Sequence, residues 1–172
     1  MRDWWLRTVL VVSAPRPVFV ALRGDDADDR AEPVLLVIIL AGIALALASN
    51  AAADYEGLDL AVWAFIAGGI TGAAAYWFFG AVLFGAARAL GSHGSYRRAR
   101  HVLAFACVPL ALSLVALPAG LHAFSWVVLA FVAWSAVLLV LGVRAVHGWS
   151  WPRATAAAIA PIATVALVLA LG

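Results

Sequence analysis

The feature that most constrains this chain is the length of its uncharged apolar stretches. A helix needs about 20 apolar residues to cross the hydrocarbon core of a bilayer. With 66% hydrophobic and 12% charged residues, a soluble fold of 172 residues would leave much apolar surface in water. We therefore predict an all-α, polytopic transmembrane helix bundle of five spans, at about residues 33–53, 60–89, 102–121, 123–143 and 154–171.

Residues 1–32, which precede the first predicted span, mix aromatic residues with arginines. Trp4 and Trp5 lie close in sequence to Arg2 and Arg7. This mixture is typical of the headgroup zone, where aromatic rings are half-buried and guanidinium groups reach phosphates. We expect a cytoplasmic region with one or more short interfacial helices, separate from the transmembrane domain of residues 33–172.

The arginines beyond residue 32 lie near two of the loops that these spans define. They are Arg88, Arg97, Arg98, Arg100, Arg144 and Arg153. Because cytoplasmic loops are enriched in basic residues, and five spans place every arginine on one side, we predict a cytoplasmic N-terminus and an external C-terminus. The absence of lysine and the many alanines are typical of a GC-rich bacterial genome. The predicted location is therefore a bacterial inner (plasma) membrane, with multiple passes.

The second predicted span, residues 60–89, is longer than one crossing requires. We expect it to tilt, to extend past the bilayer or to bend near Gly68–Gly69 or Gly80. Small residues recur along it at helical spacing, and Gly68, Gly72 and Gly85 are the predicted helix-packing positions. A small residue at every fourth position lets another helix approach closely. A helix of the same chain is favoured as the partner, although a second protomer also fits the pattern.

No sequence pattern indicates catalysis or a bound cofactor. The chain contains neither an HExxH nor a GxSxG motif, and no predicted span holds a pair of carboxylates. Its single cysteine, Cys107, lies in an apolar run, and its histidines lie in separate loops or span ends. We predict no enzyme activity, no cofactor and no metal. The net charge of +2 is too small to indicate nucleic-acid binding.

The most informative segment is the predicted loop from Gly91 to Arg100. Glycines allow close backbone approach, and arginines beside a span attract anionic headgroups or an acidic partner. A topology signal combined with a turn explains the arginines, but it leaves the spacing of Gly91 and Gly94 unexplained. The candidate partner- or lipid-binding residues are Tyr96, Arg97, Arg98 and Arg100.

This loop and its surroundings resemble a known family. The run Gly91-x-x-Gly94-Ser95-Tyr96-Arg97-Arg98 leads into a span that contains Pro109, and this region is similar to the signature of the Yip domain family of Ypt/Rab-interacting membrane proteins. The segment from Ser13 to Phe19 is also similar to one that precedes the first span in bacterial members. Eukaryotic members bind prenylated Rab-type GTPases and each other in vesicle trafficking. For a bacterial chain the resemblance implies the architecture, with Gly91, Gly94 and Pro109 as structural positions of the family motif.

Two functions remain open at this stage. The favoured one is a non-enzymatic membrane protein that organises protein partners or anionic lipids through its cytoplasmic arginines, with self-association or another membrane protein as a partner. The alternative is a small-molecule or ion transporter or channel, lined by the helices that glycine and proline interrupt. A polar cavity near Thr71, Ser113 and Pro109 would favour this alternative.

Overall fold

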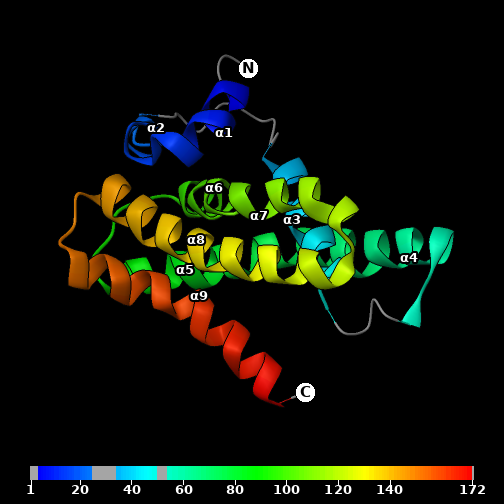
Figure 1. The fold of residues 1–172 in the computed structure, drawn as a ribbon. Coiled ribbons are helices and arrows are strands. Elements are labelled where there is room, and N and C mark those ends of the chain that lie inside the picture. The colour runs from blue at the N-terminus through cyan, green and yellow to red at the C-terminus, as the bar shows by residue number, and fades with distance from the viewer. Residues whose placement is uncertain (1–3, 25–33, 50–53, 172) are drawn as a thin grey trace.

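The computed structural model describes residues 4–24, 34–49 and 54–171, with side chains as far as Thr164. Within these ranges every regular element is a helix, which confirms the all-α prediction (Figure 1). In chain order the elements are α1 (Trp4–Ser13), α2 (Pro15–Ala21), α3 (Leu35–Leu47), α4 (Gly57–Ala64), the π-helix η2 (Phe65–Ile70), α5 (Thr71–Ala89), α6 (Tyr96–Ala106), α7 (Val108–Leu112), the 3₁₀ helix η3 (Ser113–Ala119), α8 (Leu121–His147) and α9 (Trp151–Leu171).

Three continuous helical stretches of the described chain are long and apolar enough to cross a membrane. They are Gly57–Ala89 with 33 residues, Tyr96–Ala119 with 24 and Leu121–His147 with 27. The helix within the first predicted span, α3, has only 13 residues. At about 1.5 Å per residue it is about 20 Å long, which is less than the roughly 30 Å of a hydrocarbon core. Five crossings therefore stay a prediction.

The helix that contains the third predicted span begins at Tyr96, before residue 102, so the predicted loop from Gly91 to Arg100 is wrong from Tyr96 onward. Helix α6 begins at Tyr96 because the Ser95 side chain caps it, accepting a hydrogen bond from the backbone N–H of Arg98 at 3.2 Å. The candidate residues Tyr96, Arg97, Arg98 and Arg100 thus lie on the first turns of a helix. Helix α6 ends at Ala106, with Cys107 as its C-cap, and Pro109 lies in the first turn of α7, where proline is tolerated.

The long second helix deviates from α geometry where two glycines meet α3. A Cβ added to Gly68 would lie 2.7 Å from the Gly42 carbonyl carbon, and one added to Gly72 would lie 3.2 Å from the Gly42 Cα. Gly68 lies in the π-helix Phe65–Ile70, and Gly72 follows it in α5. Gly85 differs from the expectation, because a Cβ there would have no atom within 4 Å. Gly68 and Gly72 therefore pack against another helix, whereas Gly85 faces open space.

Helices α1 and α2 occupy the region for which short interfacial helices are predicted, and they pack against one flank of the bundle beside α6 and α8 (Figure 1). Phe19 of α2 is fully buried. It lies so close to Gly142 of α8 that a Cβ there would be 2.8 Å from the Phe19 Cε1 atom. The docking of α2 thus depends on a large side chain opposite a glycine.

The long helices run antiparallel, so two of their turns meet at one end of the bundle. These are the α5–α6 turn of residues 91–95 and the α8–α9 turn of residues 148–150, both on the left in Figure 1. We call this end, with Arg23, Arg88, Arg98, Arg144 and Arg153, the basic end. The described carboxylates, Asp54, Glu56 and Asp59, precede or begin α4 at the opposite end. Among the residues that the structure describes, charge is therefore distributed asymmetrically along the bundle.

Candidate functional site

The turn between α5 and α6 begins with a glycine-dependent helix cap. Gly91 has a φ of +81°, its N–H donates to the Arg88 carbonyl at 2.9 Å, and the next N–H, of Ser92, donates to the Ala87 carbonyl at 2.9 Å. This pair of bonds is a Schellman motif, which needs a left-handed residue at the position of Gly91. The first glycine of the motif therefore ends α5.

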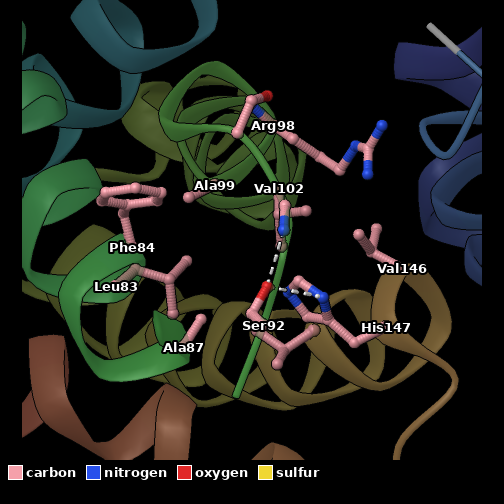
Figure 2. Close-up of a pocket in the computed structure, with 12 residues that line it drawn as sticks. Leu83, Phe84, Ala87, Ser92, Arg98, Ala99, Val102, Val146 and His147 are labelled. Carbon is pink, nitrogen blue, oxygen red and sulfur yellow. Dashed lines mark hydrogen bonds between the residues drawn. The ribbon is translucent and has the colours of Figure 1, made fainter. Parts of the chain in front are cut away.

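The second glycine makes room for a contact between the α5–α6 turn and α8. Ser92 Oγ lies 3.2 Å from Nδ1 of His147 and accepts a hydrogen bond from the Gly94 N–H at 2.9 Å (Figure 2). With that N–H donating to it, the serine hydroxyl can donate its own proton to His147. A Cβ at Gly94 would be only 3.1 Å from the His147 ring. Gly94 thus shapes a turn that is held against α8. This contact accounts for the glycine spacing that a topology signal did not explain.

Tyr96 joins the start of α6 to α5. Its hydroxyl donates to the Trp77 carbonyl oxygen at 2.7 Å, and its ring packs edge-on against Phe84 with centroids 5.9 Å apart. The hydroxyl therefore has a partner inside the chain, and the residue anchors two antiparallel helices.

Arg100 points into the bundle. It is 9% exposed, and its guanidinium carbon lies 4.7 Å from the Tyr96 ring centroid and 5.2 Å from that of Tyr76. Its side-chain stem passes Gly80, where a Cβ would be 2.3 Å from the Arg100 Cγ. Arg100 was a candidate for partner or lipid binding, but the structure places it between tyrosines instead of on the surface. Arg97 is half-buried one turn earlier.

Other arginines of the basic end bind carbonyl groups at helix ends. Arg153 donates through Nε at 3.0 Å, and also through Nη2, to the Leu90 carbonyl at the end of α5. Arg23 donates through Nε at 2.8 Å, and also through Nη2, to the Ala145 carbonyl in the last turn of α8. Cations near a helix C-terminus satisfy its last carbonyls and interact favourably with the helix dipole. Arg98 Nη2 in turn donates to the Arg23 carbonyl at 2.9 Å.

A groove opens between α5, α6 and α8 at this end (Figure 2). Its cavity volume is about 10 Å³, which is room for about one water molecule. Its polar lining consists of Ser92, Gly94, Ser95, Arg98 and His147. Its apolar lining consists of Leu83, Phe84, Ala87, Ala99, Val102, Val143 and Val146. The groove therefore has a polar, basic side and apolar walls.

Ser92 is 6% exposed, and its hydroxyl oxygen contacts His147 and accepts the Gly94 N–H, so this oxygen is held within the turn. Among the described residues, no group of three or more histidine, cysteine, aspartate or glutamate side chains is placed to hold a metal ion.

Four residues that make contacts at the basic end were not selected as candidates from the sequence: Ser92, His147, Arg23 and Arg153. Ser92 and His147 are 55 positions apart, and Arg23 and Ala145 are 122 apart. The sequence feature that could have identified some of them is a basic residue next to a helix end, since Arg153 and His147 flank the turn between the last two predicted spans. Their actual partners depend on which helix ends meet.

Comparison with known proteins gives one match. The family model described as the Yip1 domain matches residues 9–172, which is nearly the whole chain. No curated protein and no solved structure matches the chain significantly.

Proposed function

The chain is a member of the Yip1 domain family, and we propose that it organises protein partners or lipids through its arginine-rich end, without catalysing a reaction. Family membership and its apolar helices make it a multi-pass membrane protein. The observation that carries the proposal is the convergence of the α5–α6 and α8–α9 turns, which gathers arginines from distant parts of the sequence at one end. Basic clusters beside membrane spans attract anionic headgroups and acidic proteins.

We further propose that α3 and α9 cross the membrane together with the three longer helical stretches. The basic end then faces the cytoplasm of a bacterium, and the C-terminus lies outside the inner membrane. Two features support this orientation: the arginines at the basic end, and Asp54, Glu56 and Asp59 at the other end. A membrane that thins around the 13 residues of α3, or the packing of α3 against its neighbours, would accommodate its short length.

The proposed partners are anionic headgroups and either a second copy of the chain or another membrane protein. Gly85 lies on the exposed surface of α5, with no atom within 4 Å of the position of a Cβ. This surface supports the approach of a further helix, because small residues permit close backbone contact.

The alternative of a transporter or channel has little support at its expected location. The Thr71 hydroxyl donates to the Ala67 carbonyl of its own helix. Ser113 is 1% exposed, and its hydroxyl donates to the Leu110 carbonyl oxygen, 2.6 Å away. Both hydroxyls are thus satisfied by backbone.

The proposal is tested by native mass spectrometry of the protein extracted from its own membranes in lipid nanodiscs. We expect a stoichiometric protein partner or retained anionic lipid, and loss of that component when Arg97 and Arg98 are both changed to alanine. Arg100 stays unchanged, because its burial makes it part of the fold. Wild-type protein that carries neither component would contradict the proposal and direct attention to flux assays in liposomes.

A further inference from the structure

The Ser92–His147 contact joins two parts of the basic end through one titratable side chain. We propose that these residues form a pH-sensitive latch, which holds the α5–α6 turn against the end of α8 while the imidazole is neutral and releases it on protonation. The latch connects residues 55 positions apart in sequence, one in a turn and one at the end of a helix. It goes beyond the proposed function, because it does not depend on which lipid or protein binds at the basic end.

The hydrogen bonds of Ser92 define the closed state of the latch. Its Oγ accepts the Gly94 N–H at 2.9 Å and lies 3.2 Å from His147 Nδ1, so the hydroxyl can donate its proton to a neutral imidazole nitrogen (Figure 2). A protonated Nδ1 has no lone pair for that proton and can only donate. The serine oxygen could accept this second N–H, but its own proton would then lose its acceptor although Ser92 is only 6% exposed. Protonation therefore breaks or reverses the bond that closes the latch.

The charged groups that face His147 disfavour its protonated form. Arg98 of α6, Arg23 after α2 and Arg153 of α9 each act on the imidazole from a different element. Trp149 stacks on the imidazole with ring centroids 4.5 Å apart, and the Arg153 guanidinium carbon lies 4.4 Å from the same Trp149 centroid. The indole face thus already has a cation nearby. A protonated His147 would add a further positive charge among three arginines.

The described elements around His147 contribute no carboxylate to offset this charge. Their other arginines and histidines are Arg88 of α5, His93 of the turn, Arg97, Arg100 and His101 of α6, and Arg144 of α8 itself. The described carboxylates, Asp54, Glu56 and Asp59, precede or begin α4. From there to Ala89 the continuous helix of 33 residues is about 50 Å long, so these acids are remote from His147. The acidic residues that follow Gly24 lie outside the described chain.

The direction of the pH effect follows from this environment. Residue 147 lies beyond the fourth predicted span, 123–143, at the basic end. Burial first, and then Arg98, Arg23 and Arg153, lower the pKa of His147 below its ordinary value while the latch is closed. In the open latch the imidazole meets solvent, and its pKa returns towards the ordinary value just below neutral pH. The closed latch is therefore fully stable above that ordinary value, and it loses stability as the pH falls towards the lowered pKa.

The test is amide hydrogen exchange of the full chain in detergent at about pH 7.5 and about pH 5, on either side of the ordinary imidazole pKa. Mass spectrometry follows peptides that contain residues 92–95, and division of the intrinsic rate at each pH by the observed rate gives a protection factor. His147→Asn keeps an oxygen near the position of Nδ1 but cannot be protonated. Ser92→Ala removes the acceptor of the Gly94 N–H. The matched control is His93→Gln, which removes an exposed histidine of the same turn.

We expect the protection of residues 92–95 in the wild type to fall roughly fivefold from the higher to the lower pH, the loss typical of one hydrogen bond. His93→Gln should show the same fall. His147→Asn should keep its protection at both pH values, and Ser92→Ala should be weakly protected at both. Thermal unfolding at the higher pH shows which variants are folded.

Three results would overturn the latch. The first is wild-type protection that does not change with pH, and the second is an equal fall in His147→Asn, which would assign the pH effect to other groups. The third is loss of the fall in His93→Gln, which would assign the titration to His93. If His147→Asn does not fold, Ser92→Ala decides instead, because a fall in this variant equal to that of the wild type would show that the serine hydroxyl does not close the latch.

Discussion

The stem of Arg100 passes Gly80 so closely that a Cβ at Gly80 would lie 2.3 Å from the Arg100 Cγ. The Cγ is near the start of the side chain, so the arginine cannot avoid the clash by moving only its tip. The absence of a side chain at Gly80 therefore allows Arg100 to reach Tyr76 and Tyr96. The contact joins α5 to α6 in the interior of the bundle.

We predict that Gly80→Ala lowers the stability of the protein in detergent. Overfilling a packed contact typically costs about 1–3 kcal/mol, which exceeds the gain of about 1 kcal/mol from replacing glycine by alanine in a helix. The control is Gly85→Ala in the same helix, where a Cβ has no atom within 4 Å and the helix-propensity gain should dominate. Thermal unfolding should give a lower midpoint for the first variant and an unchanged or higher one for the second. Equal midpoints would show that Arg100 does not depend on Gly80.

A second prediction concerns the cap of α5. Gly91→Ala should destabilise the protein by about 1–2 kcal/mol, because an L-residue is disfavoured at the φ of +81° found there. Gly91→Asn should cost less, since asparagine tolerates the left-handed region better than alanine. The two variants are compared by thermal unfolding under the same detergent conditions. The cap assignment fails if alanine is tolerated as well as asparagine.

The glycine pattern shows what the sequence can and cannot predict. Spacing along the second span selected Gly68, Gly72 and Gly85 alike, and the first two contact α3 through Gly42. Gly85 has the same four-residue spacing to Ala81 and Ala89, but at about 100° per residue it lies roughly 140° around the helix from Gly72, and it faces open space. The sequence showed the spans as apolar runs, but the number of crossings depends on whether short helices such as α3 cross the membrane.

The arginine-rich segment shows a second limit. From the sequence, Arg100 beside the third predicted span was interpreted as a surface charge, and Ser95, which caps α6, was assigned to a loop. Arg100 is instead buried against tyrosines, four residues into a helix that begins at Tyr96. The Ser92–His147 contact could not be predicted locally, since it depends on the meeting of the α5–α6 turn with the end of α8.

A third prediction separates the two roles of Tyr96. Tyr96→Phe removes the hydrogen bond to the Trp77 carbonyl but keeps the ring beside Arg100 and Phe84, so we expect a loss of about 1 kcal/mol. Tyr96→Ala also removes the ring contacts and should cost more. Unfolding midpoints should therefore fall in the order wild type, Tyr96→Phe, Tyr96→Ala. Equal effects of the two substitutions would mean that the ring contributes nothing beyond its hydroxyl.

The last prediction concerns the attachment of α2 to the bundle. Phe19 is fully buried against Gly142, whereas the adjacent Val20 is 41% exposed. Because truncating a buried phenylalanine typically costs about 3–5 kcal/mol, Phe19→Ala should release α2 far more often than Val20→Ala does. The readout is trypsin cleavage after Arg23 in detergent, where Arg23 is held by its bonds to the Ala145 carbonyl. Cleavage after Arg16 does not interfere, since Pro17 follows it and trypsin cuts poorly before proline.

We expect cleavage after Arg23 to be at least tenfold faster in Phe19→Ala than in Val20→Ala, because even about 1.4 kcal/mol of the lost packing corresponds to a tenfold larger open population. If both variants are cleaved at the wild-type rate, α2 is held mainly by the arginine bonds of the basic end, and Arg23→Gln should then release it.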